Sequence, residues 1–275
     1  MVRIITDSAA DFEIEDIKKL GISVIPLSVF FGDDEYQETV NITKQEFYEK
    51  LIASQDFPHT SQPSPESYMK VMQDAMDNGD EAVVITLSSA LSGTFQSATL
   101  AKTALEYDNC YVVDSLSATL GQRLLVEYAV RLRDEGKSAA DIAAEIENIR
   151  SKVVIYACVD TLDYLHKGGR ISHVSYAMGS LAKIKPIITV SNEGKVEIPA
   201  KALGKNKAIK LLCNKIQETE PDENHPVYAV YSHEIDNAND LISATDVKVD
   251  KAINLGSVIG THVGIGAFGF IYISK

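Results

Sequence analysis

The chain has 275 residues, which exceeds the usual size of one domain and favours two. Its 26 basic and 39 acidic residues give a net charge of −13, which argues against binding to nucleic acid or to anionic membrane surfaces. No apolar run reaches the roughly 18 residues of a transmembrane helix, and the first residues lack a signal-peptide pattern, so we expect a cytoplasmic protein.

Strands and helices alternate through the first half of the chain. Short apolar runs predict the strands, and stretches with helical spacing and capping residues separate them. We expect strands at residues 2–6, 23–31, 82–87 and 111–113, and helices at residues 11–20, 44–54, 65–77, 95–105, 120–134 and from 139 onward. This alternation predicts an α/β domain with a largely parallel sheet over residues 1–150.

The second half of the chain has a different pattern, with a hairpin and fewer regular alternations. We expect strands at residues 153–159, 186–190, 195–202, 227–231 and within 264–274, a helical turn at 161–165, and helices at 175–184, 206–219 and 237–244. The turn at residues 192–194 predicts that the strands on either side pair as a hairpin. We therefore expect a smaller α+β domain over residues 151–275, and the absence of a flexible linker near residue 150 indicates that the two domains pack closely.

The sequence gives no sign of a metal site. The chain has three cysteines, which are isolated and odd in number: Cys110, Cys158 and Cys213. They are expected to be reduced core residues, because cysteine metal ligands come in closely spaced pairs. Asp7, Asp11 and Asp114 could be interpreted as a metal cluster, but carboxylates directly after strands more often stabilise turns.

Two segments rich in serine and threonine precede predicted helices. Residues 88–94 (Ser-Ser-Ala-Leu-Ser-Gly-Thr) follow a buried strand, and residues 59–65 (His-Thr-Ser-Gln-Pro-Ser-Pro) lie upstream. A helix start offers unpaired N–H groups and the positive end of a dipole, so added hydroxyl donors can complete an anion site. The same residue types are also the commonest helix N-caps, which is a purely structural role. Neither segment carries a P-loop lysine, which favours a carboxylate or small polar head over a nucleotide.

Six short motifs occur in a fixed order along the chain. They are residues 7–8 (Asp-Ser), 60–63 (Thr-Ser-Gln-Pro), 91–94 (Leu-Ser-Gly-Thr), 165–172 (Leu-His-Lys-Gly-Gly-Arg-Ile-Ser), 185–187 (Lys-Pro-Ile) and 260–264 (Gly-Thr-His-Val-Gly). As an ordered set they resemble the DegV family of fatty-acid-binding proteins, and the resemblance covers residues 1–275. The chain departs from the family at Ile265, where a proline is usual, and we expect this change to alter a loop without abolishing binding.

The resemblance implies a two-domain carrier that is not itself an enzyme and needs no cofactor. Members hold one long-chain fatty acid, such as palmitate (hexadecanoate), in a tunnel between the domains. The hydroxyls of Thr60 and Ser92 are expected to hold the carboxylate, with Ser61 and Gly93 beside them. His262 lies in a flexible-looking loop and is expected either to bond the carboxylate or its hydroxyl neighbours, or to have only a structural role.

The resemblance also implies a protein partner. Members with a clear role present the acid to a separate ATP-dependent fatty acid kinase related to dihydroxyacetone kinases, which forms an acyl phosphate for phospholipid synthesis. We expect a monomer, and the role allows transient contact with a membrane. Lys167 and Arg170 form either a solvated basic turn or a contact to the kinase and the transferred phosphate. In the second interpretation, Arg170→Ala spares fatty acid binding and impairs phosphorylation.

Two other functions remain open from the residues alone. Ser92 could be the nucleophile of a hydrolase or acyltransferase, although the G-x-S-x-G elbow is absent. The loop of Ser92 could also belong to a module that binds a small anion such as a phosphate or sugar phosphate. A long apolar tunnel distinguishes a fatty acid carrier from both alternatives, because neither of them needs one.

Overall fold

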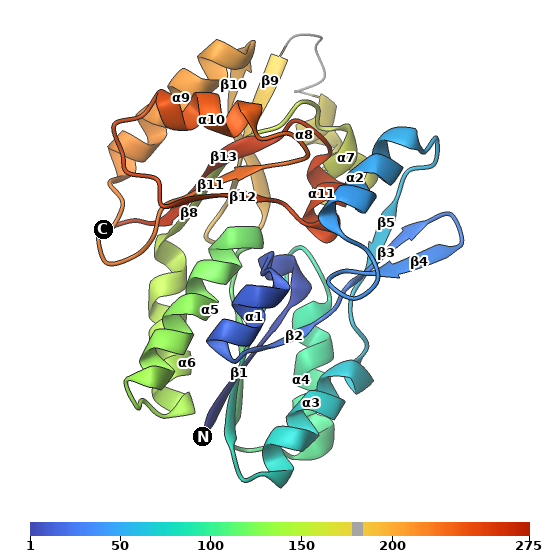
Figure 1. Ribbon diagram of the computed structural model, residues 1–275, viewed down its shortest axis with the longest axis vertical. Helices are drawn as coiled ribbons and strands as arrows, with labels where there is room; N and C mark the ends of the chain where they lie inside the picture. The colour runs from blue at the N-terminus through green and yellow to red at the C-terminus, as the bar shows by residue number, and fades with distance from the viewer. Residues whose placement is uncertain (178–183) are drawn as a thin grey trace.

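The computed structural model describes residues 1–177 and 184–275, whose strands form three sheets (Figure 1). A four-stranded sheet takes its strands from the first 114 residues, and a six-stranded sheet takes its strands from residue 153 onward. A three-stranded sheet lies beside them, at the right of Figure 1. The strands thus change sheet near residue 150, where the sequence predicts a boundary between two domains.

The four-stranded sheet is parallel, as predicted, with the order β2-β1-β6-β7. Its strands are β1 (Val2–Asp7), β2 (Ser23–Ile25), β6 (Glu81–Thr86) and β7 (Cys110–Asp114). Ile4 and Val83 point to one face and Ile5 and Val84 to the other, and all four are buried. Burial on both faces explains why these strands have nearly continuous apolar sequences.

Helices cover both faces of this sheet. One face packs against α1 (Ile14–Leu20), α5 (Thr119–Asp134) and α6 (Ala139–Ile149), and the other against α3 (Pro65–Asp77) and α4 (Thr94–Leu105). The predicted capping serines are confirmed, because Ser64 and Ser138 each accept a hydrogen bond from the helix that follows. The predicted α/β layer is therefore confirmed. Short 3-10 turns lie at Ser8–Ala10 and Arg150–Lys152.

The six-stranded sheet is mixed, with the order β10-β9-β8-β13-β11-β12. Its strands are β8 (Val153–Cys158), β9 (Ile184–Val190), β10 (Val196–Leu203), β11 (Tyr228–Tyr231), β12 (Lys251–Asn254) and β13 (Phe268–Ile273). The predicted hairpin is confirmed, because β9 and β10 pair antiparallel around residues 192–194. The helices α9 (Lys205–Thr219) and α10 (Asp236–Ser243) cover the outer face, which leaves the inner face turned toward α5 (Figure 1).

The third sheet contains β3 (Ser28–Phe31), β4 (Asp34–Gln37) and β5 (His59–Ser61), all antiparallel. The prediction of one strand over residues 23–31 is wrong, since β2 and β3 belong to different sheets. Pro26 lies between them and cannot donate to a strand ladder, so pairing stops there. The helix α2 (Lys44–Ala53) follows, with the predicted capping box between Thr43 and Glu46.

Three predicted helical segments also differ from the structure. The helix expected from residue 11 begins only at Ile14, because Asp11 takes a left-handed conformation with φ 57°. The turn expected at residues 161–165 is shifted to α7 (Asp163–Lys167). Of the helix expected at residues 175–184, the structure has α8 (His173–Ala177) and places Ile184 in a strand, while residues 178–183 lie outside the described residues.

The prediction of a loop at His262 is wrong, because His262 lies on the helix α11 (Ser257–Val263). The glycine and β-branched residues of this segment are weak helix formers, so the segment has no helical signal in its sequence. The helix is held by packing: it contacts α2, α7 and β3, which come from both halves of the chain. The three cysteines are free and buried, as expected for core thiols.

Candidate ligand site

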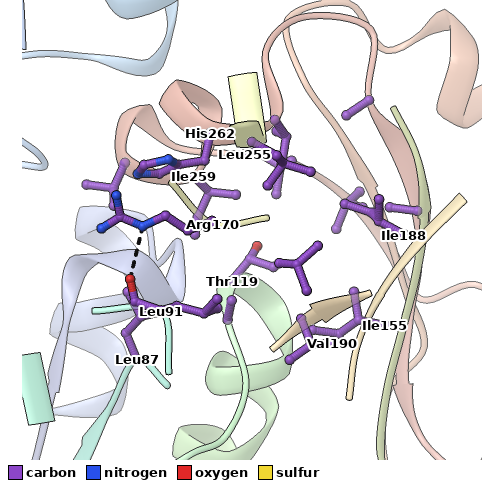
Figure 2. Close-up of a pocket in the computed structure, with 18 of the residues that line it drawn as sticks. Leu87, Leu91, Thr119, Ile155, Arg170, Ile188, Val190, Leu255, Ile259 and His262 are labelled. Atoms are coloured by element: carbon purple, nitrogen blue, oxygen red, sulfur yellow. Dashed lines mark hydrogen bonds between the residues drawn. The ribbon is translucent and has the colours of Figure 1, made fainter. Parts of the chain in front are cut away.

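An apolar cavity lies between the inner face of the six-stranded sheet, the start of α5, and α11 (Figure 2). It comprises about 840 Å³ of space between atoms, a figure that includes its opening to solvent. Most of the lining side chains are aliphatic: Leu27, Leu87, Leu91, Ala118, Ile155, Ala157, Val159, Leu165, Ile188, Val190, Val196, Val230, Leu255, Val258, Ile259, Val263, Ala267 and Ile271. Such a surface suits a hydrocarbon ligand.

The cavity has one polar end. Figure 2 shows Arg170 between Leu91 and His262 on one side, while Ile155, Ile188 and Val190 lie on the opposite side. Thr60 and Ser92 also line the cavity, and the hydroxyl of Thr60 lies 3.0 Å from Nε2 of His262. The structure thus brings Thr60, Ser92 and His262 to one cavity, as the sequence predicts, and adds Arg170 to them.

Arg170 is the charged residue among the described residues that line the cavity. Its Nε donates to the carbonyl of Leu91 at 3.0 Å, and one terminal nitrogen donates to the carbonyl of Gly168. Within the described ranges, no carboxylate forms an ion pair with this guanidinium, and burial lowers its pKa. A half-buried cation without a counter-ion attracts an anion strongly, because water screens it only in part.

His262 is uncharged at neutral pH. Burial, together with the positive charge of Arg170, lowers the pKa of its imidazole to about 3. In the described part of the chain, its Nδ1 is buried without a hydrogen-bond partner. The remaining proton therefore belongs on Nε2, where it donates to the oxygen of Thr60. This arrangement leaves the hydroxyl proton of Thr60 free to point into the cavity.

Glycines allow the sequence motifs to meet at this end of the cavity. A Cβ at Gly93 would lie 1.9 Å from the side-chain oxygen of Gln62, so the glycine lets Gln62 pack directly against the backbone of the second hydroxyl-rich segment. A Cβ at Gly168 would lie 2.3 Å from Nδ1 of His262. The role of Gly93 is thus close approach of a neighbouring side chain, and Gly168 does the same for His262.

Ser92 lies one residue before the N-cap of α4. Its oxygen lies 2.8 Å from the hydroxyl of Thr94 and accepts from the backbone N–H of Thr94 at 3.3 Å. A serine nucleophile needs a base beside it and a third group that orients the base. The imidazole of His262 instead contacts Thr60, and no described group orients it through Nδ1. Among the described residues, Ser92 therefore has no base oriented beside it.

The cavity lining does not include three of the predicted site residues, which are Ser61, Gly93 and Lys167. Ser61 is exposed, because it follows Thr60 on β5 and successive side chains of a strand point to opposite faces. Lys167 is also exposed, with its ammonium 4.9 Å from the ring centre of Phe57. Asp7 and Asp114 act in turns, as predicted, since Asp7 accepts from the N–H of Ala9 and Asp114 from that of Leu116. Asp11 differs, because its carboxylate accepts from the distant residues Thr119 and Gly256.

Sequence reasoning missed Thr119, which lines the cavity at the start of α5. Its φ of 49° is unusual for a β-branched residue and indicates strain. Its hydroxyl donates to Asp11 at 2.5 Å. The predicted helix began one residue later, and no local pattern connects Thr119 to Asp11, so the sequence held no signal for this contact.

Comparisons with known proteins agree on one family. The family model described as "Uncharacterised protein, DegV family" matches residues 1–275. A DegV domain-containing protein of Caldanaerobacter subterraneus is 32% identical, and the match covers 100% of this chain and 99% of that protein.

Several solved structures of similar proteins are named as fatty acid binding proteins. A fatty-acid-binding DegV family protein of Thermus thermophilus has a TM-score of 0.89 at 32% identity. A stearic-acid-binding protein of Eubacterium ventriosum has a TM-score of 0.89 at 29% identity, and DegV of Bacillus subtilis, named as a fatty acid binding protein, has 0.83 at 31%. Each match covers 100% of this chain and 99% of the other.

Proposed function

Since the chain belongs to the DegV family, we propose that it binds one long-chain fatty acid in the cavity, with the carboxylate at the Arg170 end. The observation that carries this proposal is the polarity of the cavity, in which a single guanidinium lies at one end of an aliphatic space. A phosphate or a sugar has no hydrocarbon chain to contact the aliphatic lining. The fatty acid binding named for the similar structures supports the same ligand class.

The alkyl tail supplies the driving force for binding. Each buried methylene contributes about 0.8 kcal/mol, so a sixteen-carbon chain gains on the order of 10 kcal/mol before the costs of association. The lining offers mainly aliphatic contacts from β8, β9 and β13, including Ile155, Ile188 and Ile271. A protein with this cavity can therefore keep a poorly soluble acid in aqueous solution.

The head group is held by four side chains in this proposal. Arg170 supplies the charge, and the hydroxyls of Thr60 and Ser92 donate to the carboxylate oxygens. His262 acts on Thr60, since its Nε2 occupies the hydroxyl oxygen and directs the hydroxyl proton toward the ligand. Together these groups offset the cost of removing a carboxylate from water.

Thr60→Ala and Ser92→Ala are each expected to raise the dissociation constant for palmitate by about tenfold to a hundredfold, because each removes a hydrogen bond to a charged group. Equilibrium titration of the delipidated protein measures the effect. Ser61→Ala is the matched control and is expected to bind like the unmodified protein, since Ser61 is exposed. Unchanged affinity in both Thr60→Ala and Ser92→Ala would contradict the head-group assignment.

We further propose that the protein is a monomeric carrier that presents the bound carboxylate to a separate fatty acid kinase. Thr60, Ser92 and Arg170 are half-buried, and the exposed Ser61 and Lys167 are their neighbours in the chain, so the head group lies near the surface. Phosphoryl transfer to the bound acid needs this access. The carrier itself contributes no nucleophile in this scheme.

Incubation of the palmitate-loaded protein with ATP and a dihydroxyacetone-kinase-like fatty acid kinase tests the carrier role. The expected product is palmitoyl phosphate, trapped as its hydroxamate, and it should not form when free palmitate replaces the loaded protein. Absence of product with the loaded protein would contradict the partnership while leaving fatty acid binding intact. Hydrolysis of a long-chain ester that is lost in Ser92→Ala would favour a hydrolase instead.

A further inference from the structure

Two buried carboxyl groups meet at the start of α11. Asp11 and Glu38 are 2% and 5% exposed. One oxygen of each lies within 2.5 Å of the position that a Cβ at Gly256 would occupy, which places the two groups side by side. Only a glycine fits between them. Asp11 and Glu38 are thus built into the protein interior as a pair, outside the cavity described above.

Both groups bind the first residues of α11. Asp11 accepts from the backbone N–H of Gly256 at 2.7 Å. Glu38 accepts from the hydroxyl of Ser257 at 2.9 Å and from the N–H of Val258 at 3.1 Å, both through one oxygen. The other oxygen of Glu38 is buried without a hydrogen-bond partner among the described residues. Burying a carboxyl group with an unpartnered oxygen costs less free energy when the group is neutral. This favours a proton on Glu38.

The pair is connected directly to the cavity. The second oxygen of Asp11 accepts from Thr119, whose side chain lines the cavity. The helix α11 itself contributes Val258, Ile259 and His262 to the lining. A movement of α11 therefore changes the cavity wall, and it also changes the contact between His262 on α11 and Thr60 on β5.

We propose that Asp11 and Glu38 are positioning residues for the fatty acid site. They hold α11 in its binding arrangement while Glu38 carries a proton, and they release α11 when both carboxyl groups are ionised. This inference rests on the proposed fatty acid binding. Two negative charges side by side in the interior repel each other, and separating them displaces either α11 or the segment after β4. The expected consequence is weaker binding at alkaline pH.

The surroundings of the pair favour a proton at neutral pH. Burial, together with the neighbouring charge of Asp11, raises the pKa of Glu38 to about 7. Burial likewise raises the pKa of Asp11, although nearby cations oppose it. The titratable and charged groups that act on the pair are Lys44 and Tyr48 of α2, Arg123 of α5 and Asp7 of β1. Behind them, Glu13 binds Lys44 and Tyr231 lies near Tyr48.

Linkage gives the sign of the effect. Because the binding arrangement of α11 is the one in which the pair keeps its proton, ligand binding and proton binding strengthen each other reciprocally. Affinity is therefore highest below the pKa of Glu38 and falls as the pH rises through it. The head-group residues do not produce this trend, since His262 is already uncharged throughout that range.

The test is titration of the delipidated full-length protein with palmitate at pH 6.5, 7.5 and 8.5, in buffers of different ionisation enthalpy so that calorimetry also counts protons. The unmodified protein is expected to lose about fivefold in affinity between the extremes and to take up a proton on binding near pH 7.5. Glu38→Gln is expected to bind with little pH dependence and no proton uptake. A pH dependence that arose from Asp7 would persist in this variant.

Two further variants show whether the pH dependence of binding comes from the pair. Asp11→Asn removes one charge of the pair by a second route, and its left-handed backbone is one that asparagine tolerates. Asp34→Asn changes an exposed carboxylate on β4 and should retain the pH dependence of the unmodified protein. Equal affinity at pH 6.5 and 8.5 in the unmodified protein would overturn this inference alone. Failure to bind palmitate at every pH would overturn the proposed function, and this inference with it.

Discussion

Replacing Arg170 with alanine is expected to weaken palmitate binding by about a hundredfold or more, the largest effect of any single head-group substitution. The guanidinium has only carbonyl partners and no described counter-ion, so the ligand carboxylate is its natural partner. Removing one member of a buried charge pair typically costs about 2–5 kcal/mol, because the other charge is left without compensation. Titration of the delipidated variant with palmitate measures the loss.

Two controls accompany Arg170→Ala. Arg170→Lys keeps the charge but loses the planar fork, so it should recover part of the affinity. Lys167→Ala removes an exposed cation nearby and should bind normally. Normal binding by Arg170→Ala combined with failure in the kinase assay would assign this residue to the partner contact instead, which is the role that the sequence alone suggested.

Replacing Val190 with phenylalanine is expected to shorten the fatty acid that the protein prefers. Val190 lines the cavity at the end opposite Arg170 in Figure 2. A ring there takes space from the last carbons of the tail, and each methylene that cannot enter loses about 0.8 kcal/mol. Palmitate affinity should fall by tenfold or more, by the order-of-magnitude relation between free energy and affinity, while laurate affinity stays nearly unchanged.

Competition between palmitate and laurate for the same sample reports this shift directly. Thr189→Phe is the matched control, because Thr189 precedes Val190 on β9 and points to the opposite face of the strand. It should keep the original preference. Equal losses for both acids in Val190→Phe would indicate general damage to the cavity, and an unchanged preference would mean that the tail does not reach this end.

Much of the fold follows from local sequence signals. The strands of the parallel sheet are apolar runs, and α2 and α3 begin at capping residues, Thr43 and Ser64. Elements whose form depends on distant contacts could not be predicted in this way. The helix α11 has weak helix formers and is held by packing from both halves of the chain. Pro26 marks the break between β2 and β3, but the sheet that each strand joins depends on partners elsewhere in the chain.

The site shows the same division. Thr60, Ser92 and His262 could be named from motifs, and the structure brings them to one cavity. The pair of Asp11 and Glu38 could not be found, because its partners Gly256 and Ser257 are more than two hundred residues away in the sequence. Whether a side chain faces a cavity or solvent depends on the folded surface, so the sequence alone cannot show that Arg170 lines the cavity or that Ser61 is exposed.

Identification of the molecule that fills the cavity tests the central claim most directly. The protein is purified under native conditions, its mass is measured with ligand retained, and a denaturing organic extract is analysed by mass spectrometry. We predict one long-chain fatty acid per chain, released on denaturation. A protein that carries no lipid, and that takes up neither palmitate nor oleate when they are supplied, would contradict the account.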